Sequence, residues 1–134
     1  MDTAYKLAMK AQIAEIAEEL AEIQTLEAEQ GYLPTMAYRA AERNLQLLVE
    51  ACIGIAKQTL KSLGKNTPNE ARQVFEKLKA EGQDHSNIPW NKVVGMRNAL
   101  VHDYLNIDRE RIISVIRNNH HSELITFVRE KIET

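Results

Sequence analysis

The strongest constraint on the fold is a continuous apolar stripe within the first thirty residues. Its members recur at spacings of four and three, which places them on one side of an α-helix: Met9, Ile13, Ile16, Leu20, Ile23 and Leu26. Most glutamates of the segment fall outside the stripe, and Gly31 follows, where a glycine commonly ends a helix. We therefore predict a long amphipathic helix that ends at Gly31 and packs its stripe against other helices.

A second apolar segment runs from about Thr35 to Leu63 with hydrophobic residues at helical spacing, and Gly64 stops it. Cys52, the only cysteine of the chain, falls inside this segment, so an intramolecular disulfide is impossible. We expect Cys52 to be a small buried hydrophobic residue, which fits a reducing cytoplasm.

Two shorter helices are expected next. Thr67 to Glu70 match a capping box with a proline at the first helical position, which predicts a helix ending near Gly82. After a polar loop, Pro89 and Trp90 open a helix whose expected end is Asn106.

The last helix is predicted to begin at Arg109. Ile107 and Ile112 flank Asp108 as a hydrophobic staple flanks an N-cap, and residues 118–121 are a possible interruption. No useful strand-like alternation appears. We therefore predict an all-α, up-and-down bundle of four or five helices that forms a single domain over residues 1–134.

Composition excludes several classes of protein. The residues AVILMFWYC make up 44% of the 134 residues and DEKR 27%, with only 5 Gly and 3 Pro, which indicates a soluble helical domain. The N-terminus has no signal-peptide core, and no stretch approaches the ~18 apolar residues of a membrane span. A formal charge of −2 gives the whole molecule no preference for nucleic acid. We expect a cytoplasmic protein that does not enter a membrane.

The stretch MRNALVHDY, from Met96 to Tyr104, breaks the simple pattern. On a helix Arg97 falls near the centre of an apolar face, where an unpaired charge is costly. Continued helix geometry pairs Arg97 with Tyr104 on one surface and Asn98 with His102 on the next.

Two explanations of this arrangement remain open from the residues alone. In the first, Arg97 pairs with a buried glutamate of the first helix, His102 is an ordinary hydrogen-bonded histidine, and Tyr104 fills the core. In the second, the helix packs against its own copy across a two-fold axis and brings two Arg97 and His102 sets into one cleft.

The same stretch resembles a known family. Its Arg-Asn-x3-His-x-Tyr pattern is that of the HEPN superfamily, and it looks like the HepT-type toxins that are paired with minimal nucleotidyltransferase antitoxins. The segments ERNLQLLVEACIGIAKQTL, W-x2-VVGMRN and the Tyr-x2-Ile-Asp exit at Tyr104 to Asp108 extend the resemblance over most of the chain.

The resemblance implies a dimeric all-α ribonuclease whose motif helices form a shared cleft and which cuts RNA without a required metal or cofactor. It assigns His102 as the acid or base and Arg97 as the phosphate clamp, a chemistry that both side chains suit. Asn98 would orient the histidine or hold substrate, or be only a polar surface residue. Tyr104 would be the position to which the partner nucleotidyltransferase transfers AMP.

Other features give weaker hypotheses. His85 with His120 and His121 could be imagined as a metal site, but adjacent histidines on a helix point about 100° apart. Four cations could line a cleft mouth, although scattered surface charge is the commoner interpretation: Lys92, Arg109, Arg111 and Arg117. The rival functions are a non-catalytic helical module that binds nucleotide or presents substrate to a nucleotidyltransferase, and a structural four-helix dimer.

Overall fold

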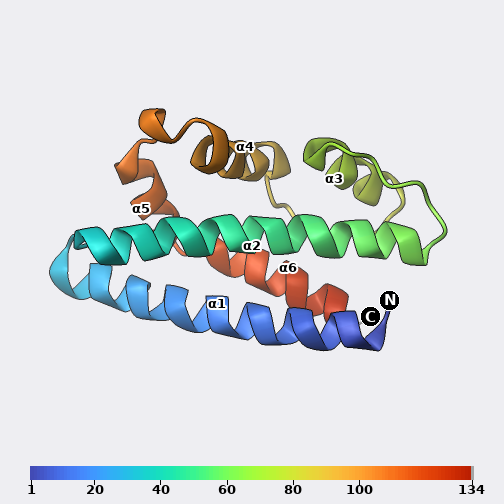
Figure 1. Ribbon diagram of the computed structural model, residues 1–134, viewed down its shortest axis with the longest axis horizontal. Helices are drawn as coiled ribbons and strands as arrows, with labels where there is room; N and C mark the ends of the chain where they lie inside the picture. The colour runs from blue at the N-terminus through green and yellow to red at the C-terminus, as the bar shows by residue number, and fades with distance from the viewer. Residues whose placement is uncertain (134) are drawn as a thin grey trace.

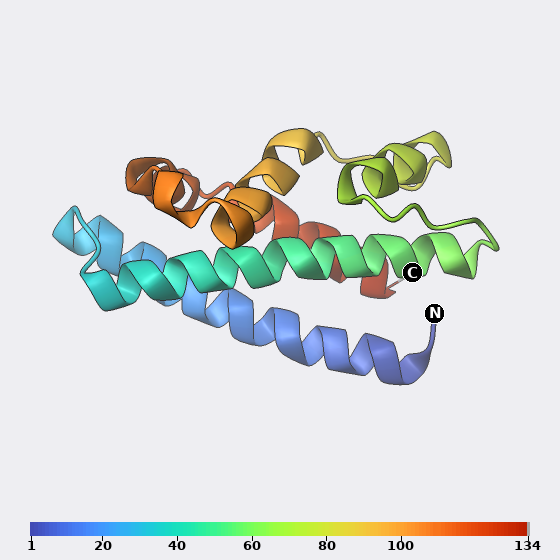
Figure 2. The same cartoon turned by 45° about the horizontal axis from the view of Figure 1, so that its top comes forward.

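The computed structural model describes residues 1–133, which form α-helices and one 3₁₀ turn and no strand. The elements are α1 (Thr3–Gln30), α2 (Thr35–Ser62), α3 (Ala71–Ala80), α4 (Trp90–His102), η1 (Tyr104–Asn106), α5 (Arg109–Arg117) and α6 (His121–Glu133). Figure 1 shows α1 and α2 as a long antiparallel pair, and Figure 2 shows α3 and α4 along the opposite side of α2. The prediction of an all-α bundle is confirmed, with six α-helices in the described residues in place of four or five.

The α1 stripe is buried as its spacing predicts. Met9, Ile13, Ile16, Leu20 and Ile23 are buried and Leu26 is half-buried, and α1 packs on α2, α5 and α6. Gly31 ends the helix with a φ of 76°, and its N–H donates to the Glu27 carbonyl at 2.7 Å. Cys52 is buried and free, also as expected.

Aromatic packing fixes where α4 begins. The Trp90 ring stacks on Phe75 of α3 with centroids 3.8 Å apart, and its edge contact with Phe127 of α6 has a centroid distance of 4.8 Å. The indole Nε1 donates to the buried Asp84 carboxylate at 2.8 Å. One side chain thus ties the first residue of α4 to two other helices and to the loop before it.

The predicted capping box at Thr67 to Glu70 is wrong. Helix α3 begins at Ala71, its N-cap Glu70 makes no side-chain capping hydrogen bond, and Thr67 lies in the non-helical segment before it. The first backbone bond runs from the Val74 N–H to the Glu70 carbonyl at 3.1 Å, and Val74 is also the first buried residue of the helix. Packing of the short buried face therefore outweighs the local capping preference.

The helix that carries the motif is shorter than predicted. It ends at His102 rather than Asn106, and Asp103 leaves helical geometry with a φ of −139°. The Asn106 side chain donates to the Asp103 carboxylate at 2.7 Å, a local bond that competes with helix continuation and holds the 3₁₀ turn η1. Tyr104 is consequently not stacked above Arg97 on one helical surface, as the sequence had suggested.

The final segment is divided in two. Asp108 caps α5 as predicted, because its carboxylate accepts from the Glu110 N–H at 3.0 Å. The interruption separates α5 from α6, and Asn119 there has a φ of 59°. Gln24 of α1 braces the break by donating to the Ile116 carbonyl at 3.1 Å and to Asn119 Oδ1 at 3.3 Å. None of the helices in residues 1–133 is long and apolar enough to cross a membrane.

His121, the first residue of α6, is a buried histidine whose protonation would oppose folding. It is buried, and its Nδ1 has no hydrogen-bond partner. Burial lowers the pKa of His121, the charge of His120 acts in the same direction, and the Val115 carbonyl opposes them. In the unfolded chain a histidine titrates near ~6.5, so below that pH the unfolded state binds the proton more readily than the folded state.

We expect the free energy of unfolding to fall as the pH drops from 7.5 to 5, and His121→Leu to reduce that fall. Urea denaturation at the two pH values measures the difference. His85→Gln, a change at an exposed histidine in the loop before α4, is the matched control and should leave the dependence in place. An unchanged pH dependence in His121→Leu would show that another group is responsible.

Candidate functional site

Arg97 and Asn98 share a polar cavity between α3 and α4. The cavity has a volume of about 370 Å³ and is lined by both side chains, by Val94, and by residues 69–72 at the start of α3. Both motif residues are half-buried. The structure therefore brings Arg97 and Asn98 together and places both beside the start of α3.

A second arginine, Arg72 of α3, lines this cavity and passes close to Gly95 of α4. Arg72 donates from Nη2 to the Asn91 carbonyl at 3.3 Å, and a Cβ at Gly95 would lie 3.2 Å from the same nitrogen. Two guanidinium groups from different helices therefore line one cavity. Sequence reasoning missed Arg72, whose only local signal is its place in the first turn of α3.

Arg97 carries an unused donor. Its Nε is buried without a hydrogen-bond partner, and the Arg97 guanidinium forms no ion pair with a carboxylate of residues 1–133. The buried glutamate of α1, Glu27, is instead paired with Arg117 at 3.1 Å. The explanation in which Arg97 pairs with a buried glutamate of the first helix is therefore wrong. A guanidinium with a free donor beside a polar cavity is suited to bind an anion.

His102 lies at the end of α4 and is exposed. Its imidazole has no hydrogen bond or ion pair with any other described residue, so it is not the hydrogen-bonded histidine of the simpler explanation. It does not line the cavity that holds Arg97 and Asn98. One copy of the chain thus presents the arginine and the histidine of the motif on different parts of α4.

Tyr104 is not core filler. Its side chain is 51% exposed, and its hydroxyl donates to the Glu42 carboxylate of α2 with an O–O distance of 2.7 Å. This hydrogen bond is the main reason that the pKa of Tyr104 is raised, and partial burial and the Glu42 charge add to it. Arg39 and Arg109 act in the opposite direction, because their positive charges favour the phenolate.

Glu42 belongs to a buried group that sequence reasoning missed. It is 7% exposed, and Tyr38, one turn earlier on α2, is 3% exposed with a hydroxyl that has no hydrogen-bond partner. The Arg109 guanidinium lies 4.0 Å from the centre of the Tyr38 ring. Burial is the main cause that raises the pKa of Tyr38, and Glu42 contributes. A glutamate in line with Tyr38 and Leu45 on an apolar face was the available signal.

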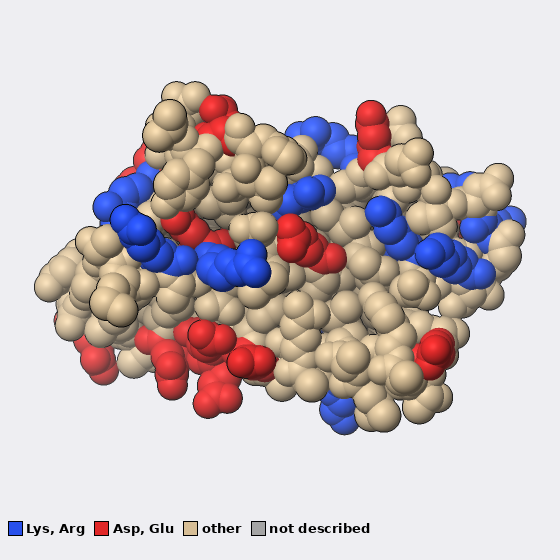
Figure 3. All heavy atoms as spheres, in the orientation of Figure 1, with Lys and Arg blue, Asp and Glu red and all other residues tan. Residues whose placement is uncertain are grey.

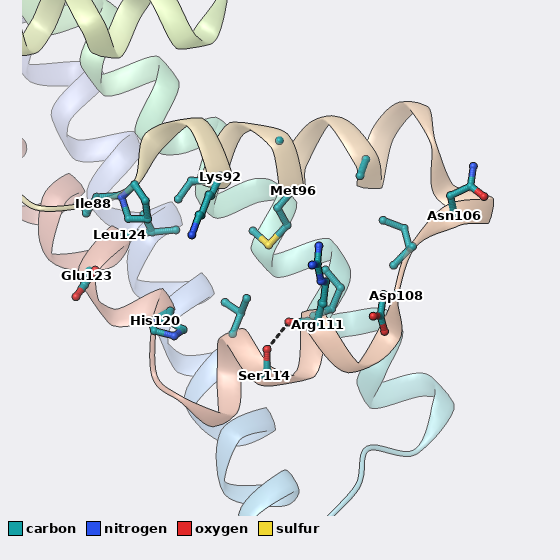
Figure 4. Close-up of a pocket in the computed structure, with 17 residues that line it drawn as sticks. Ile88, Lys92, Met96, Asn106, Asp108, Arg111, Ser114, His120, Glu123 and Leu124 are labelled. Carbon is teal, nitrogen blue, oxygen red and sulfur yellow. Dashed lines mark hydrogen bonds between the residues drawn. The ribbon is translucent and has the colours of Figure 1, made fainter.

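A larger groove lies on the other side of α4, between α4, α5 and α6. Its volume is about 730 Å³, and Met96, Ile112 and Val115 contribute apolar surface. Figure 4 shows Met96, Lys92 and Arg111 directed into this space. The groove is thus mainly apolar, with two cations of the predicted basic rim beside it.

The other two cations of that predicted rim lie elsewhere. Arg109 is held on Tyr38, and Arg117 is held by Glu27 and by Glu110 at 3.0 Å. The four cations therefore do not form one basic rim, and the interpretation as scattered charge is the correct one. No three His, Cys, Asp or Glu side chains within residues 1–133 are placed to hold a metal ion.

The chain is similar to a curated protein and to a solved structure. The mRNA nuclease HepT of Shewanella oneidensis is 33% identical over 82 residues, which are 60% of this chain and 60% of the relative. The solved structure, described as "Crystal structure of the toxin-antitoxin with AMP-PNP", matches with a TM-score of 0.71 at 23% identity, over 98% of this chain and 99% of that one. At that identity the match shows the fold alone, which is the arrangement of the helices in a bundle.

The family comparison covers nearly all of the described helices. The family described as Ribonuclease HepT-like matches residues 12–130, which run from α1 into α6 and include the whole motif stretch. The chain therefore belongs to the HepT-like ribonuclease family.

Proposed function

We propose that this chain is the toxin of a toxin–antitoxin pair, a metal-independent RNA endonuclease that acts in the cytoplasm as a homodimer. The whole chain forms one HEPN-like domain, and each cleft takes residues from two copies. The observation that carries the proposal is the buried, unpartnered Nε of Arg97 in a cavity shared with Asn98 and Arg72. The family and the mRNA nuclease relative support RNA as the substrate.

The assigned chemistry follows from what RNA cleavage requires. A base takes the proton of the ribose 2′-OH, an acid protonates the leaving 5′-oxygen, and positive charge stabilises the phosphorane oxygens. Histidine titrates close to neutrality, so His102 can serve as base or acid. Arg97 binds phosphate oxygens, and Asn98 on the same cavity holds substrate.

The dimer is supported by the surface around the motif. Three large hydrophobic side chains at the end of α4 are exposed: Val101 at 40%, Tyr104 at 51% and Leu105 at 98%. Each chain supplies one motif histidine, so two copies are needed for one His102 to act as base while the other acts as acid. A second copy over this end of α4 would cover the apolar side chains and complete the pair.

Inhibition by a nucleotidyltransferase antitoxin completes the proposal. The antitoxin binds the toxin and transfers AMP to the exposed Tyr104, two residues after His102. The added phosphate is negative and would repel RNA phosphate at the cleft. A fold shared with a chain from a toxin–antitoxin structure supports such a partner.

The first test is cleavage of labelled RNA in EDTA by the dimer, after intact mass has shown that Tyr104 carries no AMP. We expect His102→Ala and Arg97→Ala to lower the rate by about 10²–10⁴-fold, the range for loss of one acid–base group or oxyanion donor. His120→Gln and Arg129→Ala, at exposed positions on or beside α6, are the matched controls. No cleavage by the wild type on varied RNAs would favour the nucleotide-binding module.

The second test is AMP transfer. We expect the nucleotidyltransferase antitoxin with ATP to add AMP to the wild-type chain and to abolish its RNA cleavage. Tyr104→Phe should accept no AMP and keep its cleavage in the presence of the antitoxin and ATP. Tyr32→Phe, which changes another exposed tyrosine, should behave as the wild type does. Peptide mapping that found AMP on a different residue would contradict the assignment.

A further inference from the structure

The buried carboxylate at the Tyr104 hydroxyl forms no ion pair. Glu27 and Glu42 are both buried. Glu27 forms an ion pair with Arg117, whereas Glu42 takes part in no ion pair. The hydrogen bond that satisfies Glu42 comes from the phenol of Tyr104. A buried carboxylate is costly, so its placement against one exposed tyrosine calls for an explanation.

We propose that Glu42 is the proton acceptor that makes Tyr104 a nucleophile when AMP is transferred to it. The proposal rests on the AMP transfer of the proposed function and assigns part of the modification site to the toxin itself. The distance of 2.7 Å between the phenol oxygen and Glu42 Oε1 lies within the ~2.6–3.2 Å reach of a general base.

The proposed step balances within these groups and a nucleoside triphosphate held by the antitoxin. The phenol oxygen forms a bond to the α-phosphorus, and the bond from that phosphorus to the oxygen bridging to the β-phosphate breaks. Pyrophosphate leaves with those bonding electrons, and the phenol proton moves to the Glu42 carboxylate. The acceptor is needed because a phenol is largely protonated at neutral pH, with an ordinary pKa near ~10.

The surroundings of the hydroxyl favour an arriving phosphate. Arg39 and Arg109 lie close enough to Tyr104 for their charges to act on its ionisation. Figure 3 shows basic side chains over the N-terminal half of α2 with a few acidic ones among them, whereas acidic side chains alone gather over the neighbouring part of α1. The phosphorus would therefore approach Tyr104 near the positive charges of Arg39 and Arg109, with the proton acceptor at the hydroxyl.

A phosphorus electrophile tests the proton transfer without the antitoxin. Diisopropyl fluorophosphate reacts with a phenol by the same attack on phosphorus, with fluoride as the leaving group. We expect Tyr104 to be labelled faster than Tyr32, which is 60% exposed. Glu42→Gln should slow labelling of Tyr104 by about 10²-fold, as loss of a general base does, and leave Tyr32 unchanged.

The pH profile separates proton acceptance from simple support of the turn. The wild-type rate at Tyr104 should be level between pH 6 and 8. In Glu42→Gln the rate should rise about tenfold per pH unit, because only the phenolate then reacts. Glu42→Asp keeps the carboxylate and should retain the level profile at a reduced rate. Glu50→Gln, at an exposed glutamate on the same helix, is the matched control.

The outcomes distinguish this proposal from the proposed function. Equal rates and equal profiles for wild type and Glu42→Gln, by the electrophile or by AMP transfer, would overturn the role of Glu42 alone. A wild-type chain that accepts no AMP from the antitoxin would overturn the modification itself and this role with it. Circular dichroism shows whether Glu42→Gln folds. If it does not fold, Glu42→Asp still tests the pH profile, because this variant retains the carboxylate.

Discussion

The burial of most of α2 by the other helices is the constraint on which the rest of the structure depends. This helix packs against each of the five other α-helices in the described residues. Leu45, Leu48, Val49 and Ile55 are fully buried, and a helix with an apolar face this wide needs several helices to cover it. Helices α1 and α6 cover one side of α2, and helices α3 and α4 cover the other. The motif helix α4 therefore packs directly on α2. A charged residue on α2 is therefore held in place by the whole bundle, which is why Glu42 can be both buried and precisely placed.

Much of this fold could be predicted from the sequence because the longest helices carry their own periodicity. The stripe from Met9 to Ile23, the limits of α2 and the Asp108 cap follow from spacing and from local hydrogen bonds. The errors fall where a local rule competes with packing. Thr67 matched a capping box, yet α3 begins where its buried face begins, and helical spacing was continued past Asp103, where the side chain of Asn106 instead closes a turn.

The candidate site was only half predictable for the same reason. The motif names Arg97, Asn98, His102 and Tyr104, and their residue types suit the expected chemistry. Their partners come from distant segments: Arg72 lies 25 residues before Arg97, and Glu42 lies 62 residues before Tyr104. A motif within one helix cannot show which side chains another helix brings to it. The separation of His102 from the Arg97 cavity also emerges only from the three-dimensional arrangement, and it is a feature that the proposed two-copy cleft would explain.

The hydrogen bond between Tyr104 and Glu42 also indicates how AMP on Tyr104 could affect more than the surface that it covers. A tyrosine that carries AMP has no O–H, so it can no longer donate to Glu42, and its phosphate is repelled by that carboxylate. A buried carboxylate without a donor costs about 1–3 kcal/mol or more, so the modified side chain and the carboxylate would have to separate. Tyr104 begins the turn η1 directly after Asp103, and His102 precedes them at the end of α4. Displacement of Tyr104 would therefore disturb the turn that begins two residues after His102, which would link the proposed modification to the proposed catalytic histidine through three consecutive residues.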